Sequence, residues 1–320
     1  MNPWLGTMGT MNVPWADSLR GGRTLLLDGG TGTELRRRGA GLDATAWTGL
    51  APLASYELLR TIHADYIAAG ADVITTSTFA TARFVLEAAG HGADFDAVNR
   101  RAVAAAREAR DAAGRSVAVA GSISCLPPRF DLHAYPDEAV ENAAYRELAD
   151  TLATAGVDLL IVEMLQETHH APLALAAART TGLPVWLGVS CRLGAGDALV
   201  GFDFPLVPLE ACLDALLPLA PDAVAVMHSP VSAVLPALGA LRRRFRGPLG
   251  AYPEIGDGSS AGSATPAELS AAAEGWLDAG AQIVGGCCGT TPEHIRALRH
   301  AVGAHEARRG VAAAPGESKE

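Results

Sequence analysis

The chain has 320 residues, 49% of them hydrophobic, enough to bury the core of one barrel-sized domain or of two smaller ones. Acidic residues (35) outnumber basic ones (25), and the formal net charge of −10 argues against nucleic acid or an anionic membrane as a partner. No apolar run approaches the roughly 20 residues that a membrane-spanning helix needs. Five cysteines, two of them adjacent, are a poor basis for a disulfide framework. We therefore expect a soluble, cytoplasmic protein that acts on small molecules; whether it forms a homo-oligomer is left open.

The two ends of the chain differ from the rest in composition. Residues 1–22 contain no basic segment followed by an apolar run, so they predict a frayed N-terminal extension and not a signal peptide. Residues 305–320 have little apolar content and predict a disordered tail. No segment between them has the composition of a linker. The sequence therefore predicts one continuous catalytic domain over residues 23–304.

Within this domain, a short apolar run, a loop and an amphipathic segment rich in Ala and Leu follow one another repeatedly. The apolar runs predict eight strands, at residues 24–28, 72–76, 116–121, 158–163, 185–190, 223–227, 249–252 and 282–286. The amphipathic segments predict helices, for example at residues 55–69, 94–113, 137–155, 207–219 and 265–279. Strands that are apolar throughout and alternate with helices are typical of a parallel sheet buried on both faces.

Eight such units favour a parallel eight-stranded (β/α)₈ TIM barrel in the α/β class. The alternative is an open, doubly wound sheet. Against it, the glycine-rich segment at residues 28–33, which follows the first strand, does not have the G-x-G-x-x-G spacing of a dinucleotide-binding turn.

Polar and metal-binding residue types occur where several predicted strands end. Among them are Asp28, Thr76, Glu163, His228 and the Cys287-Cys288 pair. Because the carboxyl ends of barrel strands converge on one mouth, we expect these side chains to become neighbours there, where barrel enzymes have their active sites.

The segment at residues 285–292 is the most informative, because glycines flank Cys287 and Cys288 at a strand end and Thr291-Pro292 is typical of a helix start. Taken alone, the two cysteines could equally be small buried hydrophobic residues. His228, placed after the sixth strand, favours the other interpretation. One imidazole and two thiolates make a three-ligand zinc site with an open position, as catalytic zinc sites have.

Two acids follow apolar strands. Glu163 and Asp28 would be costly to bury without a cationic partner, and a substrate ammonium group would supply one. The alternative for each is a helix cap or a structural ion pair. The backbone N–H groups of Gly29 and Gly30 are candidates for binding a substrate carboxylate.

These motifs resemble those of the homocysteine S-methyltransferase family, which includes S-methylmethionine- and betaine-dependent enzymes. The matching segments are residues 27–35, 70–79, 158–163, 252–253 and 285–292, in the expected order. The glycine-flanked double cysteine is the most specific of them. The resemblance implies a zinc-binding barrel in which Cys287 and Cys288 are ligands and Glu163 and Asp28 contact the amino group of homocysteine.

The same resemblance implies substrate contacts for Thr76, Phe79 and Tyr252, which lie in matching segments. The chain departs from the family at its third metal ligand, where a cysteine becomes His228. It also departs at Glu254, where the family has Asn, and at Ala80, where an aromatic residue or Gln is expected. The loop at residues 121–130 differs as well.

With His228 in place of a thiolate, a zinc site has a net charge of 0 instead of −1, so a bound thiol should ionise more readily and attack more weakly. The leading hypothesis is an enzyme that moves a methyl group from a small sulfonium or ammonium donor to homocysteine, giving methionine. S-methylmethionine, S-adenosylmethionine and betaine are the candidate donors. The alternatives are the same barrel and zinc site acting on another thiol or selenol, a zinc hydrolase, or a metal-binding protein without catalysis.

Overall fold

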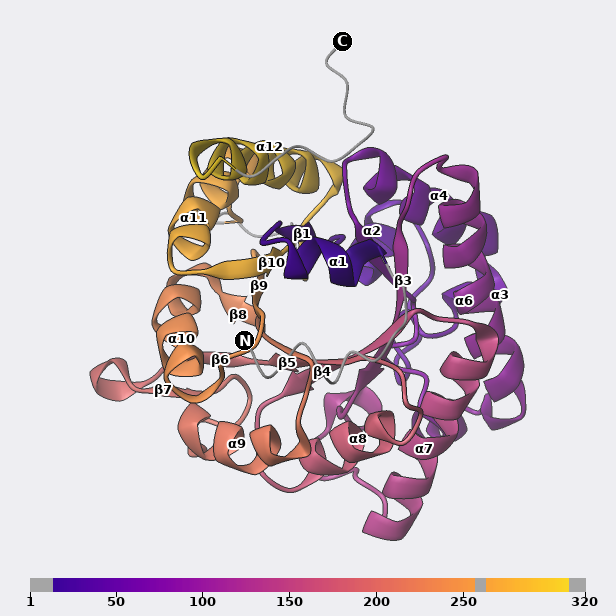
Figure 1. Cartoon of the computed structure of the whole chain (residues 1–320). Coiled ribbons are helices and arrows are strands. Elements are labelled where there is room, and N and C mark those ends of the chain that lie inside the picture. The colour runs from indigo at the N-terminus through magenta and orange to yellow at the C-terminus, as the bar shows by residue number, and fades with distance from the viewer. Residues whose placement is uncertain (1–13, 257–262, 311–320) are drawn as a thin grey trace.

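The computed structural model describes residues 14–256 and 263–310 (Figure 1). Eight parallel strands form its central sheet, in the order β1-β10-β9-β8-β5-β4-β3-β2. They are β1 Leu25–Leu26, β2 Val73–Thr75, β3 Ala118–Ser124, β4 Leu159–Leu165, β5 Val185–Val189, β8 Ala223–Pro230, β9 Leu249–Glu254 and β10 Ala281–Val284. A parallel bridge between Leu27 and Val73 joins the two ends of this series and closes the ring. The predicted TIM barrel is confirmed.

Helices surround the barrel (Figure 1). They are α2 Thr31–Arg37, α3 Ala51–Ala54, α4 Tyr56–Ala68, α5 Arg83–Ala88, α6 Phe95–Ala112, α7 Glu138–Ala155, α8 His170–Arg179, α9 Leu209–Leu216, α10 Val231–Arg244, α11 Pro266–Asp278 and α12 Pro292–Arg308. Strand residues alternate between the two sides of the barrel wall. In β4, Leu160 and Val162 pack with the residues of the helices, whereas Leu159 and Ile161 belong to the separate core inside the barrel. None of the described helices is long and apolar enough to cross a membrane.

The N-terminal segment is more ordered than the sequence suggested. Residues 14–20 form helix α1 (Pro14–Arg20), and its residues Trp15, Ala16 and Leu19 are buried in the inner core of the barrel. The Trp15 ring meets the Trp186 ring edge-on, with 5.4 Å between centroids. The prediction of a frayed extension is therefore wrong for α1, because its apolar face packs across one end of the barrel (Figure 1). Residues 1–13 lie outside the described residues.

The predicted disordered tail also begins too early. Helix α12 continues to Arg308, and both His305 and Glu306 are buried. The Glu306 carboxylate accepts a hydrogen bond of 2.7 Å from the backbone N–H of Thr24, which ties the end of the domain to its first strand. This contact explains why residues 305–308 stay helical. Residues 311–320 lie outside the described part of the chain.

The structure also contains a hairpin that the sequence did not predict. After β5, strands β6 (Cys191–Leu193) and β7 (Leu199–Gly201) form an antiparallel hairpin before α9. Its turn contains Gly194 and Gly196, and glycines between two short apolar runs are the usual hairpin signal. The hairpin moves the start of the next helix from the predicted residue 207 to Leu209.

Two barrel strands are distorted at the ends that carry predicted site residues. The register of β4 shifts between Val162 and Leu165, and that of β8 shifts between Met227 and Pro230. Within these irregular segments Met164 and His228 have positive φ angles of 59° and 41°, a backbone conformation that is uncommon for residues other than glycine. Such bulges redirect side chains, and here they lie next to the cavity described below.

Candidate active site

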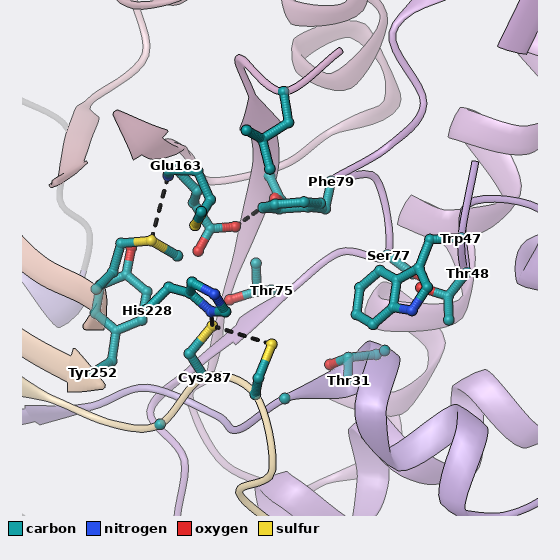
Figure 2. A pocket seen from close by; sticks show the side chains of 18 of the residues that line it. Thr31, Trp47, Thr48, Thr75, Ser77, Phe79, Glu163, His228, Tyr252 and Cys287 are labelled. Carbon is teal, nitrogen blue, oxygen red and sulfur yellow. Dashed lines mark hydrogen bonds between the residues drawn. The ribbon is translucent and has the colours of Figure 1, made fainter. Parts of the chain in front are cut away.

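A cavity of about 530 Å³ opens at the carboxyl ends of the barrel strands (Figure 2). Every residue predicted from the sequence to belong to the site lines it: Asp28, Gly29, Gly30, Thr76, Phe79, Glu163, His228, Tyr252, Cys287 and Cys288. These residues come from six different strand ends, from β1 to β10. The barrel therefore brings the predicted residues together.

The thiols and the imidazole form a compact cluster. The Cys287 Sγ lies 3.5 Å from His228 Nδ1 and 4.0 Å from Cys288 Sγ, and the ligand atoms of all three residues lie within 4.8 Å of one another. A tetrahedral zinc site with ordinary Zn–S and Zn–N bonds needs separations of about 3.5–3.8 Å between its ligand atoms. The three side chains thus fit a zinc ion with small adjustments, and all three line the cavity that a substrate would enter.

Hydrogen bonding within the cluster shifts the pKa values of the two thiols in opposite directions. The hydrogen bond from Cys287 to Cys288 raises the pKa of Cys287 well above the ordinary thiol value. The same hydrogen bond, with help from His228, lowers the pKa of Cys288 well below it. Burial lowers the pKa of His228, but the interaction with Cys288 outweighs burial and leaves this pKa raised. Without a metal the cluster thus favours one thiolate beside a cationic imidazole, and binding zinc would release protons from Cys287 and from His228.

Asp28 is buried at the end of β1. Its carboxyl oxygens accept hydrogen bonds from the Thr75 backbone N–H (2.7 Å) and the Thr75 hydroxyl (2.9 Å). Burial raises the pKa of Asp28 to about 8 despite these hydrogen bonds, and the charge of Glu163 adds to the rise. A cationic group entering the cavity would favour the ionised form of this carboxyl.

Glu163 lines the same cavity as Asp28 and lies on β4. The Ser122 hydroxyl donates a hydrogen bond of 2.5 Å to its Oε2 atom, and only 7% of the residue is exposed. Burial raises the pKa of Glu163 to about 7, although the hydrogen bond from Ser122 opposes this. Two buried carboxyls thus face one cavity, and among its described lining residues there is no Lys or Arg to pair with them.

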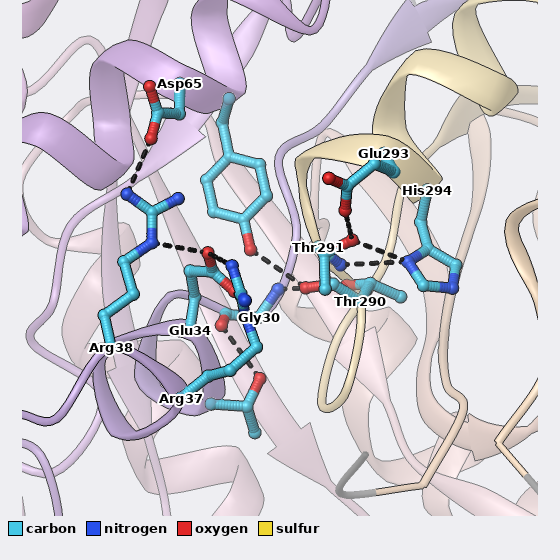
Figure 3. A network of polar contacts seen from close by, with 11 residues as sticks. Gly30, Glu34, Arg37, Arg38, Asp65, Thr290, Thr291, Glu293 and His294 are labelled. Carbon is cyan, nitrogen blue, oxygen red and sulfur yellow. Dashed lines mark hydrogen bonds and ion pairs between the residues drawn. The ribbon is translucent and has the colours of Figure 1, made fainter.

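Thr290 joins the loop after β1 to the loop that carries the cysteines. Its hydroxyl accepts a hydrogen bond from the Gly30 N–H (3.0 Å) and donates one to the Cys287 carbonyl oxygen (2.6 Å). A Cβ atom at Gly286 would lie 2.4 Å from the Thr290 side chain, so only glycine fits there. Tyr66 completes the contact by donating to the Thr290 carbonyl oxygen at 2.9 Å. Figure 3 shows this junction, where the start of α2 meets the start of α12.

This junction corrects one detail of the prediction. Because the Gly30 N–H already donates to Thr290, it is not free to bind a substrate carboxylate in this structure. Gly30 lines the cavity nonetheless, and its carbonyl oxygen accepts a hydrogen bond from the Thr33 hydroxyl. A carboxylate-binding role for the Gly29 N–H stays a prediction.

The remaining predicted residues form the walls of the cavity. Thr76 Oγ1 lies 2.8 Å from Thr78 Oγ1 and accepts a hydrogen bond from the Ser122 N–H, so its hydroxyl is part of the scaffold. Tyr252 is buried, and burial raises the pKa of its hydroxyl well above 10, with a further contribution from Glu163. The Phe79 ring meets the Trp47 ring edge-on at 6.4 Å.

Sequence reasoning missed part of the cavity wall. Trp47, Met164, Phe202 and Asp203 all line it. Figure 2 shows Trp47 on the side opposite Tyr252. Phe202 and Asp203 follow the unpredicted hairpin, so recognising its glycine-containing turn would have been the signal that could find them.

Comparison with known proteins agrees with this site. The profile of the homocysteine S-methyltransferase family matches residues 25–302. The chain is 31% identical to a homocysteine S-methyltransferase of Escherichia coli K12, over 86% of this chain and 94% of that protein. It is 26% identical to a selenocysteine methyltransferase of Astragalus bisulcatus, over 87% and 92% of the two chains.

A solved structure is also similar. The metallated form of the Escherichia coli homocysteine methyltransferase MmuM superimposes with a TM-score of 0.68 at 27% identity, over 93% of this chain and 99% of that one. The profile match covers the whole barrel and includes every predicted site residue. This protein therefore belongs to the homocysteine S-methyltransferase family.

Proposed function

We propose that this protein is a zinc-dependent enzyme that transfers a methyl group from a small sulfonium or ammonium donor to homocysteine and so forms methionine. One observation carries the proposal. The His228–Cys287–Cys288 cluster, with its ligand atoms within 4.8 Å of one another, shares a single cavity with the buried carboxyls of Asp28 and Glu163. A thiol-binding cluster and an ammonium-binding pair of carboxyls in one cavity match an acceptor that carries both a thiol and an ammonium group.

Asp28 and Glu163 bind the ammonium group of the acceptor in this proposal. The backbone and hydroxyl of Thr75 hold Asp28, and the Ser122 hydroxyl holds Glu163, so the two carboxyls are oriented before the substrate arrives. Burial raises the pKa of both carboxyls. An ammonium group that pairs with them favours their ionised forms and lowers these pKa values again. The pair therefore favours a substrate with a positive charge at this position.

The sulfur end of the acceptor points to the thiol-imidazole cluster. A zinc ion held by His228, Cys287 and Cys288 would lower the pKa of the acceptor thiol and so supply a thiolate at neutral pH. Asp28 and Glu163 orient this sulfur, because their carboxyls bind the ammonium group at the other end of a short substrate. Positioning of this kind contributes much of the rate of a bimolecular transfer.

The methyl transfer itself needs no further proton movement. The acceptor sulfur forms a bond to the methyl carbon, while the bond from that carbon to the donor sulfur or nitrogen breaks. Both electrons of the broken bond stay with the donor, which leaves as a neutral thioether or amine. Phe79, Met164 and Trp47 line the same cavity and give this step a largely apolar surrounding.

Mass spectrometry of the products tests the proposal. Zinc-loaded protein is incubated with homocysteine and, separately, S-methylmethionine, S-adenosylmethionine or betaine, with Cys287→Ser as the matched inactive control. Methionine formed by the wild type and not by the variant supports the proposal. The absence of methionine with every donor contradicts it. Parallel reactions with selenocysteine test the selenol acceptor, which the selenocysteine methyltransferase relative makes the second candidate.

A further inference from the structure

An acidic side chain, that of Asp203, lies at the solvent-exposed side of the cavity. It comes shortly after the β6–β7 hairpin that follows β5. Phe202 and Asp203 follow β7, and both line the cavity. The Phe202 ring lies 4.9 Å from the His228 ring, measured between centroids. Asp203 is exposed, in contrast to Asp28 and Glu163, which are buried deeper in the same cavity. Asp203 is therefore a solvent-exposed acid of the cavity wall, next in sequence to the residue whose ring packs against His228.

The position of Asp203 is built by reciprocal contacts. Gln166 Nε2 donates a hydrogen bond of 2.8 Å to Asp203 Oδ2, and the Asp203 backbone N–H donates one of 2.7 Å to Gln166 Oε1. A Cβ atom at Gly201 would lie 2.5 Å from the Gln166 carbonyl oxygen, so the hairpin reaches Gln166 only with glycine there. The second carboxylate oxygen makes no hydrogen bond with any residue that the structure describes. It is available to a ligand.

The direction of a methyl donor in this cavity follows from the reaction. The methyl group has to point to the acceptor sulfur at the thiol-imidazole cluster, so the rest of the donor extends toward the mouth. A donor tail that ends in a carboxylate would meet Asp203, and no Lys or Arg is among the described lining residues to pair with that carboxylate. A tail that carries an ammonium group would pair with Asp203.

We propose that Asp203 selects the methyl donor by binding a cationic group on the donor's tail. The donor class is then an amino-acid sulfonium, such as S-methylmethionine, whose tail carries an ammonium group that pairs with Asp203 and an adjacent carboxylate that is directed to solvent. Donors whose tail carries only a carboxylate, such as betaine and dimethylsulfoniopropionate, are disfavoured. This inference rests on the proposed function. In the transfer, the bond between the sulfonium and the methyl carbon breaks, its electrons stay on the donor sulfur, and the tail remains paired with Asp203 throughout.

Because the tail contact is the same before and during the transfer, its loss should raise the donor KM and leave kcat nearly unchanged. The test uses the full chain loaded with zinc and three sulfonium donors that differ in their tails. These are S-methylmethionine, dimethylsulfoniopropionate and dimethyl(propyl)sulfonium, which has no charged tail. Asp203→Asn removes the charge and keeps an oxygen that accepts from Gln166. Asp197→Asn is the matched control, since it makes the same change in the turn of the same hairpin, outside the cavity.

In Asp203→Asn we expect the KM for S-methylmethionine to rise about two- to fivefold, as for the loss of one solvent-exposed ion pair. The KM for homocysteine and for dimethyl(propyl)sulfonium should change less than twofold, and dimethylsulfoniopropionate should become a better donor. An unchanged ranking of the three donors would overturn the inference. So would an equal fall in kcat with all three, because that result indicates a structural role.

Direct binding separates this inference from the proposed function. If the wild type forms no methionine with any donor, the proposed function fails, and calorimetric titration of S-methylmethionine into zinc-loaded protein still tests Asp203. Binding about two- to fivefold weaker in Asp203→Asn than in the wild type and Asp197→Asn would support the cation site. Equal binding by all three proteins would overturn it.

Discussion

Replacing Glu163 with Gln should weaken acceptor binding and, in the same protein, increase stability. Gln has nearly the shape of Glu and keeps an oxygen that can accept the hydrogen bond from Ser122. The substitution therefore removes the charge and little else. A charged contact to an ammonium group contributes about 1.5–3 kcal/mol, so the KM for homocysteine should rise about 10- to 100-fold.

The stability effect follows from the buried carboxyl. The pKa of Glu163 is raised from 4.5 to about 7, so the unfolded chain loses this proton at lower pH than the folded protein does. Ionised Glu163 consequently destabilises the metal-free, ligand-free fold, with a cost that is absent below pH 4.5, grows as the pH rises to about 7 and is complete above that. The difference between the two pKa values corresponds to about 3 kcal/mol. For a chain of this length that amounts to about 5 °C in the melting temperature.

The assay compares melting temperatures of metal-free wild type and Glu163→Gln at pH 8 and near pH 4.5, and the KM for homocysteine at pH 7.5. Glu87→Gln, on the exposed surface of α5, is the matched control. We expect a stabilisation at pH 8 that disappears near pH 4.5. An equal shift at both pH values, or a homocysteine KM within twofold of the wild type, would refute the assignment of Glu163 as a buried ammonium-binding carboxyl.

Three further predictions concern the metal cluster, its support and the closed end of the barrel. Cys287→Ser and His228→Ala should each reduce the zinc content measured by plasma mass spectrometry; full stoichiometry in both variants would show that the ligands are wrongly assigned. Thr290→Val should lower zinc affinity about 10-fold in a chelator competition, because the Cys287 loop loses its hydroxyl link, and Thr290→Ser should restore it. Failure of Ser to restore affinity would contradict the role of the hydroxyl. Trp15→Ala should destabilise the fold by about 3–5 kcal/mol in urea titrations, with kcat of the folded enzyme unchanged. A loss below about 1 kcal/mol would mean that α1 is not part of the core.

The barrel and most of the site could be predicted because strand periodicity and strand-end chemistry are local features. Leu159 and Ile161 point inward and Glu163 continues the same alternation, so an apolar run that ends in an acid already places that acid inside. The same logic brought Asp28, His228 and the cysteine pair to one mouth. The closed order of strands in a barrel then places these strand ends around the same mouth.

The parts that could not be predicted from the sequence depend on contacts between residues that are far apart in the sequence. Helix α1 is short, and only its burial against Trp186 on β5 makes it stable, so composition alone suggested a frayed end. Likewise, the hydrogen bond from the Thr24 backbone N–H to the Glu306 carboxylate links residues near opposite ends of the chain. The hydrogen bond from the Gly30 N–H to Thr290 could not be read from either segment, because it depends on the approach of the first and last strands.

The closure of the ring by the first and last strands has a consequence for how the enzyme is made. Asp28 leaves the ribosome early, whereas Cys287 and Cys288 follow β10, the last strand of the barrel. Because β1 pairs with β10, a nascent chain cannot complete the barrel until the final part of the domain has been synthesised. The thiols are therefore the last component of the site to arrive, and they enter a barrel whose other strands are already available. For the zinc site proposed above, metal loading would consequently follow synthesis, and chains that stop before β10 lack both the closing strand and the two thiols.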